Sequence, residues 1–218
     1  MSVPVPKPVQ RVTASSSFPQ RRPGACQTVG VQMTNRPHAG ELLVADVGMG
    51  GGYFGQSVVL LLDCDGSGAL GVVLNRIADA DLDDVLPGWS ELTSAPQVLF
   101  EGGPVSQNGA VCLAKLANPT EDPPGWRRIH DDLGLLHLDT PTEIARGAYA
   151  DLRIFAGYAG WEAGQLEGEL LRGDWHRVSR LDEDVFCLST EGLWRRVLRR
   201  QGFDLALMST WSEDPEAN

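Results

Sequence analysis

Short apolar runs bounded by glycine recur along the chain from residue 41 onward, with the length of strands rather than of helices. The runs ELLVADV (41–47), QSVVLLLDC (56–64) and ALGVVLNR (69–76) are rich in valine and leucine, and they predict three strands. The turn DGSG (65–68) joins the second run to the third. This turn therefore predicts an antiparallel hairpin.

Later stretches continue the pattern. QVLFEGG (97–103) and GAVCLAKL (109–116) predict a further strand pair, and GLLHLD (134–139) and RIFAGYAG (153–160) predict two more strands. Between them, NPTEDPPGW (118–126) contains three prolines and predicts a loop.

Helical patterns are fewer. A short helix is expected to end at Pro87, and another is expected near Pro141, with Thr140 or Thr142 as its cap. Residues 190–202 predict an amphipathic helix whose apolar stripe is formed by Leu193, Trp194, Val197 and Leu198.

The block FAGYAGWEAGQLEGELLRGDW (155–175) combines glycine, aromatic and acidic residues. Gly157 and Gly160 predict a sharp passage from a strand into a helix. At helical spacing one face of that helix is polar and the other apolar, the polar set being Glu162, Gln165 and Glu169 and the apolar set Ala163, Leu166 and Leu170. The flanking Trp161 and Trp175 either pack this helix onto the sheet or form a pocket wall with Tyr158, and packing is favoured.

Strands that arrive mainly as hairpins predict an α+β fold with a largely antiparallel sheet. Residues 40–211 are expected to form one domain. Residues 1–39 are basic and rich in proline and serine, which predicts a disordered tail, and residues 212–218 are expected to fray.

The charge of the chain is uneven. The formal net charge is −11, yet the first 39 residues contain five basic residues and no acidic ones. The remainder carries 13 basic against 29 acidic residues, a net charge of −16. Such a body repels phosphate backbones, so direct binding of nucleic acid is disfavoured.

The cysteines, Cys26, Cys64, Cys112 and Cys187, are far apart and form no CxxC or Cys/His cluster. They are expected to be reduced thiols of a cytoplasmic protein, without a metal site or a cofactor. No apolar run is long enough for a secretory signal or a membrane span, so no membrane association is expected.

Three familiar motifs fail on their context. GGGYFG (50–55) has the spacing of a dinucleotide-binding loop, but a predicted strand follows it instead of a helix. DCDGSG (63–68) resembles the start of a calcium loop, but its twelfth position is Leu74 rather than glutamate. GxSxG is absent, and the four histidines, His38, His130, His137 and His176, have no recognisable nucleophile beside them.

The sequence RRVLRR (195–200) is either a patch for phosphate or a partner, or a solvated face that pairs with the protein's own carboxylates. Other polar residues are better candidates. Asn75 and Arg76 stand where a buried strand emerges, and Gly102 and Gly103 allow close backbone approach before Pro104. With the aromatic and acidic block they define a candidate binding cleft without catalytic residues: Asn75, Arg76, Gly102, Gly103, Pro104, Tyr158, Trp161, Gln165, Glu169 and Trp175.

Several blocks together resemble one family. FGQSVVLLLD, GALGVVLNR, EGGPV and GYAGWEAGQLEGEL followed by DW are similar, in this order, to the AlgH/YqgE family of bacterial proteins. The resemblance spans residues 40–209 and leaves out the basic tail. It implies a compact cytosolic α+β domain with a bent, partly barrel-like sheet and packed helices.

The resemblance implies little about activity, because the family has no established reaction. Some members are labelled transcriptional regulators on genetic grounds rather than on a recognised DNA-binding module. None of the histidines belongs to the family pattern, whose positions here are Ser57, Gly71, Asn75, Arg76, Gly102, Gly103, Pro104, Gly157, Trp161, Gly164, Gln165, Glu167, Glu169 and Trp175.

We therefore expect a non-enzymatic binding or regulatory protein that acts through a protein partner or a small ligand. The alternative is an enzyme of unrecognised type, with Asn75, Arg76, Gln165 and Glu169 converging on one cleft. A transcriptional regulator that binds DNA directly is the least favoured hypothesis, because the chain after its basic tail is acidic.

Overall fold

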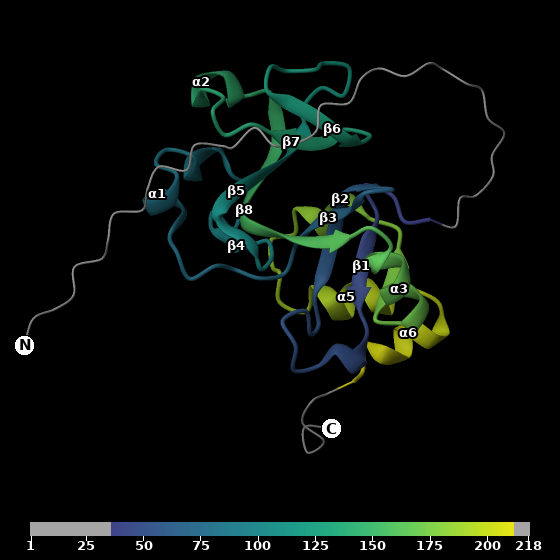
Figure 1. Cartoon of the computed structure of the whole chain (residues 1–218). Coiled ribbons are helices and arrows are strands. Elements are labelled where there is room, and N and C mark those ends of the chain that lie inside the picture. The colour runs from purple at the N-terminus through teal and green to yellow at the C-terminus, as the bar shows by residue number, and fades with distance from the viewer. Residues whose placement is uncertain (1–35, 212–218) are drawn as a thin grey trace, which may run out of the picture.

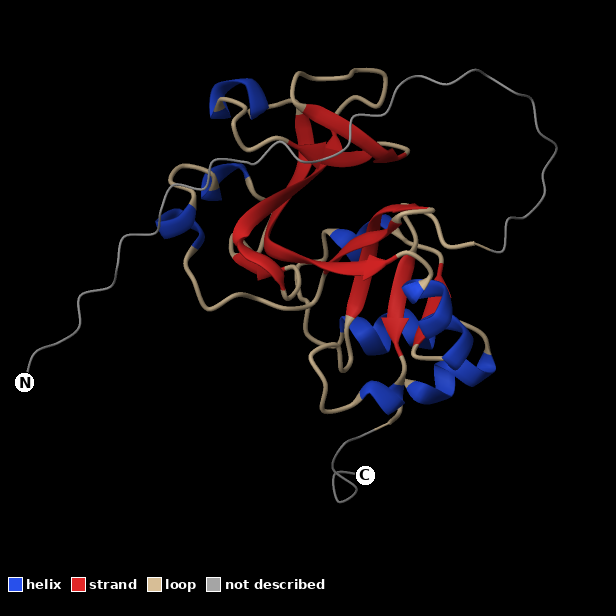
Figure 2. Ribbon diagram, in the orientation of Figure 1, coloured by secondary structure: helices blue, strands red, loops and turns tan. Residues whose placement is uncertain are grey.

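The strands form one bent sheet, drawn in red in Figure 2. The computed structural model describes residues 36–211. Its strands are β1 (Leu42–Ala45), β2 (Val58–Asp65), β3 (Gly68–Val73), β4 (Leu99–Glu101), β5 (Val105–Leu116), β6 (Trp126–His130), β7 (Leu133–Leu136), β8 (Tyr149–Glu162) and β9 (Trp175–Val178).

The sheet is almost entirely antiparallel. Its order is β6-β7-β5-β8-β3-β2-β1-β9, with antiparallel pairing between neighbours. β4 stands outside this order and pairs with β8 in parallel. The predicted α+β class with a largely antiparallel, bent sheet is confirmed.

Short helices lie around the sheet (Figure 1). α3 (Gln165–Arg172), α5 (Leu193–Arg199) and α6 (Phe203–Met208) lie beside β1–β3, and α1 (Leu82–Val85) and α2 (Thr142–Ala145) lie toward the other end. The remaining short elements are α4 (Asp182–Val185) and the 3₁₀ turns η1 (Val47–Met49) and η2 (Ser90–Leu92).

Both faces of β1–β3 are buried, which explains why their sequences are apolar without alternation. One face packs against α5 and contains Leu42, Val44, Val58 and Leu60. The alternate residues pack on the other face, with Trp161, Trp175 and Leu166 of α3, and are Leu43, Ala45, Val59 and Leu61. The sheet is therefore the central layer at this end of the molecule.

β8 belongs to both halves of the sheet. Its residues up to Ala156 pair with β5 and β4, Tyr158 pairs with Val105 of β5 after a register shift, and Ala159–Glu162 pair with β3. Gly157, with φ +68°, lies between the two stretches. The ribbon of β8 curves along its length in Figure 1, so one strand carries the sheet around its bend.

A close crossing of two backbones fixes the bend. The N–H of Gly102 donates to the carbonyl of Ala156 at 2.8 Å, and its own carbonyl accepts from the N–H of Val73 at 2.9 Å. At Gly103 a Cβ atom would lie 2.1 Å from the carbonyl carbon of Tyr158. The family residues Gly102 and Gly103 therefore act through their missing side chains.

The predicted strand-to-helix passage at Gly157 and Gly160 is wrong in position. β8 continues to Glu162 because its last residues remain paired with β3. The chain turns into α3 at Gly164, which has φ +77°.

Two further expectations need correction. The stretches 97–103 and 109–116 do form strands, but each pairs with β8 and not with the other, on opposite sides of that strand. Neither Thr140 nor Thr142 caps α2, whose N-cap is Pro141 and which makes only one turn before β8 begins.

Other local predictions are confirmed. β2 and β3 form the expected hairpin, and the side chain of Asp65 accepts a hydrogen bond from the N–H of Ser67 in its turn. The stripe on α5 is buried, although the predicted helix 190–202 ends at Arg199 and α6 follows after Gly202. The sequence patterns missed α6 and the strands at both ends of the sheet order, β6 and β9.

Arg153 of β8 is buried, and backbone carbonyls hold its guanidinium. Only 1% of the residue is exposed. Its guanidinium donates to the carbonyls of Val185 and Cys187 at 2.6 and 2.7 Å and lies 4.4 Å from the centre of the Phe100 ring. This side chain therefore holds the segment after α4 against the sheet.

Most of the predicted tail, and residues 212–218, lie outside the described residues. Within the described part, Arg36 accepts a hydrogen bond at its carbonyl from Arg177. Cys64, Cys112 and Cys187 form no disulfide in this part of the chain, and Cys26 lies outside it. No helix between residues 36 and 211 has the length and apolar character of a membrane span.

We predict that Gly103→Ala destabilises the protein by about 1–3 kcal/mol or more, because a Cβ atom at this position would overlap backbone atoms of β8. Gly66→Ala is the matched control, since a Cβ atom there meets nothing within 4 Å. Urea unfolding of both variants checks this. Equal free energies of unfolding for the two variants would contradict the role of the crossing.

Candidate functional site

Two tryptophans and a phenylalanine gather on the α3 face of the sheet. Trp161 comes from the end of β8, Trp175 begins β9, and Phe54 comes from the loop that follows η1. The ring centres of the two tryptophans are 5.9 Å apart, and the Phe54 ring lies 6.4 Å from that of Trp161 and 5.4 Å from that of Trp175. Trp161 is 7% exposed and Trp175 is 2% exposed, so the indoles form a packed cluster.

The curl of the sheet brings the two tryptophans together. Strand pairing aligns Trp161 with Cys64 of β2 and Trp175 with Ser57. Ser57 lies seven residues before Cys64 in the chain. On a flat sheet these positions would be about 19 Å apart across four strand spacings and about 23 Å apart along the strands. The observed ring contact therefore requires a sheet that coils strongly between β8 and β9.

The carboxylate of Glu169 joins the tryptophans to α3. Its Oε2 accepts from Nε1 of Trp161 at 2.7 Å and from Nε1 of Trp175 at 2.9 Å, and its Oε1 accepts from Nε2 of Gln165 at 2.9 Å. Gln165 in turn accepts from the N–H of Glu162 at 3.0 Å. The polar side of the helix thus faces the tryptophans rather than only water, and both indole donors are satisfied.

Asn75 fixes the glycine-rich loop that carries Phe54. Its Oδ1 accepts from the N–H of Val58 and its Nδ2 donates to the carbonyl of Gln56, both at 2.9 Å. Gln56 has φ +53°, a conformation uncommon for a residue with a side chain. Asn75 therefore anchors the loop at the point where it enters β2.

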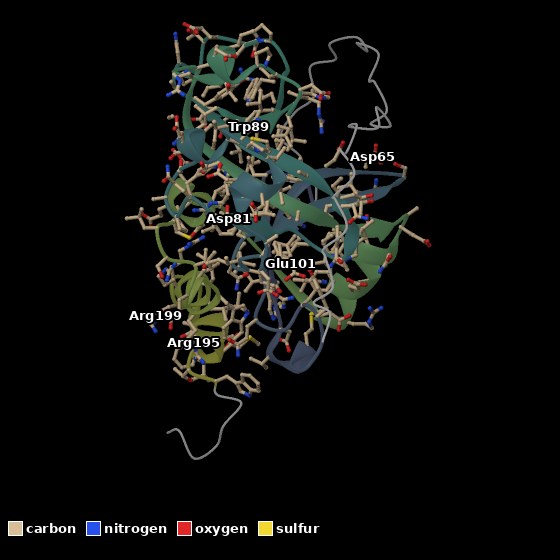
Figure 3. All side chains as sticks on the ribbon, turned by 90° about the vertical axis from the view of Figure 1, so that its left-hand side faces the viewer. Asp65, Asp81, Trp89, Glu101, Arg195 and Arg199 are labelled. Carbon is tan, nitrogen blue, oxygen red and sulfur yellow. The ribbon has the colours of Figure 1, made fainter. Side chains whose placement is uncertain are left out.

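Tyr53 anchors the same loop on its other side. Its hydroxyl donates to Oε1 of Glu101 at 2.8 Å, and the guanidinium of Arg76 lies 4.6 Å from the centre of its ring. Glu101 is labelled in Figure 3. Burial, reinforced by the Glu101 carboxylate, raises the pKa of Tyr53 to about 12, and Arg76 opposes this rise.

Tyr53 and Phe54 connect Arg76, which Tyr53 contacts, with the two tryptophans that Phe54 contacts. Their rings meet edge to face with centres 4.9 Å apart. We call the assembly of these two side chains with their contacts the aromatic–carboxylate site: Tyr53, Phe54, Arg76, Glu101, Trp161, Gln165, Glu169 and Trp175. Sequence reasoning missed Tyr53, Phe54 and Glu101; the aromatic pair inside GGGYFG was the available signal.

The other predicted residues lie outside this side-chain cluster. Gly102 and Gly103 form the backbone crossing, and Pro104 is exposed just before β5. Tyr158 packs with the core cluster of the opposite face, because it alternates along β8 with Ala159 and Trp161. Asn75 contributes by holding the loop.

The arginines of α5 and its C-cap, Arg200, are largely engaged within the protein. Arg195 donates to the carbonyl of Ser209 at 2.7 Å, and Arg196 donates to the carbonyls of Glu191 and Ser189. Arg200 pairs with the buried carboxylate of Asp184. Figure 3 labels Arg195 and Arg199 on this helix. This arrangement favours the interpretation that the cluster pairs with the protein's own groups.

Histidines and cavities lie elsewhere. Nε2 of His176 lies 2.8 Å from Oδ2 of Asp46, whose other oxygen accepts from the N–H of Gly48. One surface cavity of about 470 Å³ is lined by Val47, Asp204, Leu207, Met208, Thr210 and Trp211, and another of about 210 Å³ adjoins α1. No set of three His, Cys, Asp or Glu residues within residues 36–211 is arranged to hold a metal ion.

We predict that Glu169→Gln destabilises the protein by about 1–3 kcal/mol, because the bonds to both indoles lose the charge of their acceptor and the amide NH2 group cannot accept from Gln165. Each kcal/mol lowers the melting temperature by about 2–4 °C in a chain of this size. Glu162→Gln makes the same change at an exposed side chain and should stay within about 0.5 kcal/mol of the parent. Matching melting curves for both variants would show that Glu169 does not clamp the tryptophans.

The pKa of Tyr53 gives a second prediction. The folded protein disfavours the phenolate, so the stability contributed by Tyr53 is fully present below pH 10 and is lost as the pH rises through about 12. Glu101→Gln should move the titration of Tyr53 toward about 10. Tyr149, whose pKa burial also raises to about 12, should not respond. Spectrophotometric titration, with Tyr53→Phe to assign the signal, checks this; an unchanged curve for Glu101→Gln would refute the contact.

Comparison with known proteins places this fold in a family. Residues 42–206 match the family described as DUF179, AlgH-like. A UPF0301 protein of Streptomyces avermitilis is 48% identical over 182 residues, covering 82% of this chain and 94% of the relative. One of Mycobacterium tuberculosis is 41% identical over 186 residues, covering 84% of this chain and 92% of the relative.

Two solved structures share the architecture. The crystal structure of protein DIP2367 from Corynebacterium diphtheriae aligns with a TM-score of 0.76 at 32% identity, over 81% of this chain and 94% of that one. The solution structure of AlgH from Pseudomonas aeruginosa aligns with a TM-score of 0.59 at 27% identity, over 80% of this chain and 94% of that one. The predicted family is thus confirmed, and the chain belongs to the AlgH-like family.

Proposed function

We propose that this protein is a non-enzymatic binding protein with a regulatory role, and that the aromatic–carboxylate site holds its small ligand or protein partner. A wall of indole and phenyl rings with a few placed polar groups is the usual composition of a binding site. Here such a wall stands beside Arg76 and Glu101, which are both half-buried.

Glu169 of the site and Asn75, which anchors its loop, are committed to the protein's own structure, and this favours binding over catalysis. Glu169 accepts three hydrogen bonds, and both polar ends of the Asn75 amide are bonded to backbone. A general acid or base instead needs a position from which it reaches a reacting group. The hypothesis of an enzyme with Asn75, Arg76, Gln165 and Glu169 in one cleft is therefore the weaker one.

The glycine-rich loop is the observation that carries the proposal. It covers the tryptophans with Phe54 and reaches Glu101 with Tyr53, so both contacts are made by side chains of a connecting segment. Glycines at positions 48, 50, 51, 52 and 55 give this segment wide backbone freedom. Binding at the site would then be coupled to movement of its cover, as in proteins with closing loops.

Charge supports a partner other than DNA. The whole chain has a net charge of −11, and three of the four arginines between residues 195 and 200 already donate to groups of the protein. Phosphate backbones are attracted by clustered cations that remain available, so direct binding of DNA stays the least favoured hypothesis.

Site-specific photocrosslinking tests the proposal. A photoreactive phenylalanine analogue replaces Tyr53 in the full-length protein, and the same analogue at Ile144, 48% exposed on α2, serves as the control. After irradiation in cells, mass spectrometry should find one defined adduct at position 53 and none at position 144. Adducts that are the same at both positions, or that occur only at position 144, would overturn this assignment of the site.

A further inference from the structure

Ser57 buries a hydroxyl group that nothing in the described chain satisfies. The residue is 0% exposed, and its Oγ has no hydrogen-bond partner among residues 36–211. Nearly all buried polar groups in folded proteins have a partner, so an orphan hydroxyl calls for a specific explanation.

The register of the sheet shows which way Ser57 faces. Val44 pairs with Val58, and the next rung follows because the N–H of Ala45 donates to the carbonyl of Ser57 at 3.0 Å. Ala45 is also the partner of Trp175. Directly paired residues of neighbouring strands lie on the same face, so Ser57, Ala45 and Trp175 form one row on the face of the tryptophans.

The Phe54 ring packs against the cluster that contains Ala45 and Trp175 of this row. Its plane is nearly parallel to that of Trp161, at 22°, and stands edge-on to that of Trp175, at 67°. Phe54 is half-buried and belongs to the loop. Its backbone carbonyl accepts a hydrogen bond from the N–H of Ser57 at 3.0 Å. It is the one ring of the three that no strand carries.

We propose that Phe54 holds the place of a planar heteroaromatic ring of a small-molecule ligand, and that a polar group of this ligand bonds to the hydroxyl of Ser57. On binding, the loop lifts Phe54 away, and the ligand ring stacks on Trp161 and meets the edge of Trp175. The hydroxyl both donates and accepts, so a ring with a hydrogen-bonding edge, of the size of a nucleobase, fits this position.

Local charge disfavours a strongly anionic ligand. Glu169 accepts hydrogen bonds from both indoles, and Glu101 accepts one from the hydroxyl of Tyr53. Arg76 is the cation that the loop contacts. Together with the net charge of −11, these carboxylates disfavour ligands that carry several negative charges. This assignment rests on the proposed binding function of the site and specifies the chemistry that the site accepts.

Titration of the full-length protein with adenine and with indole tests the inference, with cyclohexanol as a polar but non-planar control. Tryptophan fluorescence should respond to adenine and indole but not to cyclohexanol. Ser57→Ala should weaken adenine binding by about 2- to 10-fold, the effect of one hydrogen bond. Phe54→Ala should bind at least as tightly as the parent, because the competing ring is gone, and Ile144→Ala should bind like the parent.

Hydrogen exchange of the parent protein gives a readout that needs no variant. Saturating adenine should speed amide exchange across residues 50–56 as Phe54 leaves, while exchange in α5 stays unchanged. The inference would be overturned if neither adenine nor indole bound to Phe54→Ala. It would also be overturned if adenine bound to Ser57→Ala as tightly as to the parent and left exchange in the loop unchanged. If a defined crosslink formed at position 53 while the tests with adenine and indole failed, the proposed binding function would be supported and only the assignment of a ring ligand would be wrong.

Discussion

The close contact of backbone at Gly102 and Gly103 with β8 is the constraint on which the rest of the structure depends. A side chain at either position would collide with the backbone of Gly157 or Tyr158. Because none is present, β4 can lie against the first part of β8 while β3 pairs with its last part. One strand thereby joins both halves of the sheet, and Trp161 is carried to the face on which α3 lies.

The curl that follows from this bend creates the aromatic–carboxylate site. Trp161 and Trp175 start from strands that are four positions apart in the sheet, yet their rings touch and share one carboxylate. Glu169 holds this arrangement from the helix side, and the loop with Phe54 closes it from the other. The site is therefore a product of the sheet's geometry rather than of any single sequence motif.

The parts of the fold that local pattern determines could be predicted from the sequence. The DGSG turn specified the hairpin, and the spacing of Leu193, Trp194, Val197 and Leu198 specified the buried face of α5. The bend at Gly157 could not be predicted, because a glycine within an apolar run is equally compatible with a strand end. The roles of Tyr53 and Phe54 depend on contacts with Arg76, Glu101 and the two tryptophans, all far away in the sequence, which local pattern does not encode. Glu169 was placed on the polar face of its helix, but the curl of the sheet turns that face toward two indoles.

A crystal structure of the full-length protein grown with adenine tests the central claim most directly, namely that the loop covers a site for a planar ring. We expect the Phe54 ring to be displaced, adenine to take its place against Trp161 and Trp175 within hydrogen-bonding distance of the Ser57 hydroxyl, and Glu169 to keep both indole contacts. A structure in which Phe54 stays in place, with adenine absent or bound elsewhere, would contradict it.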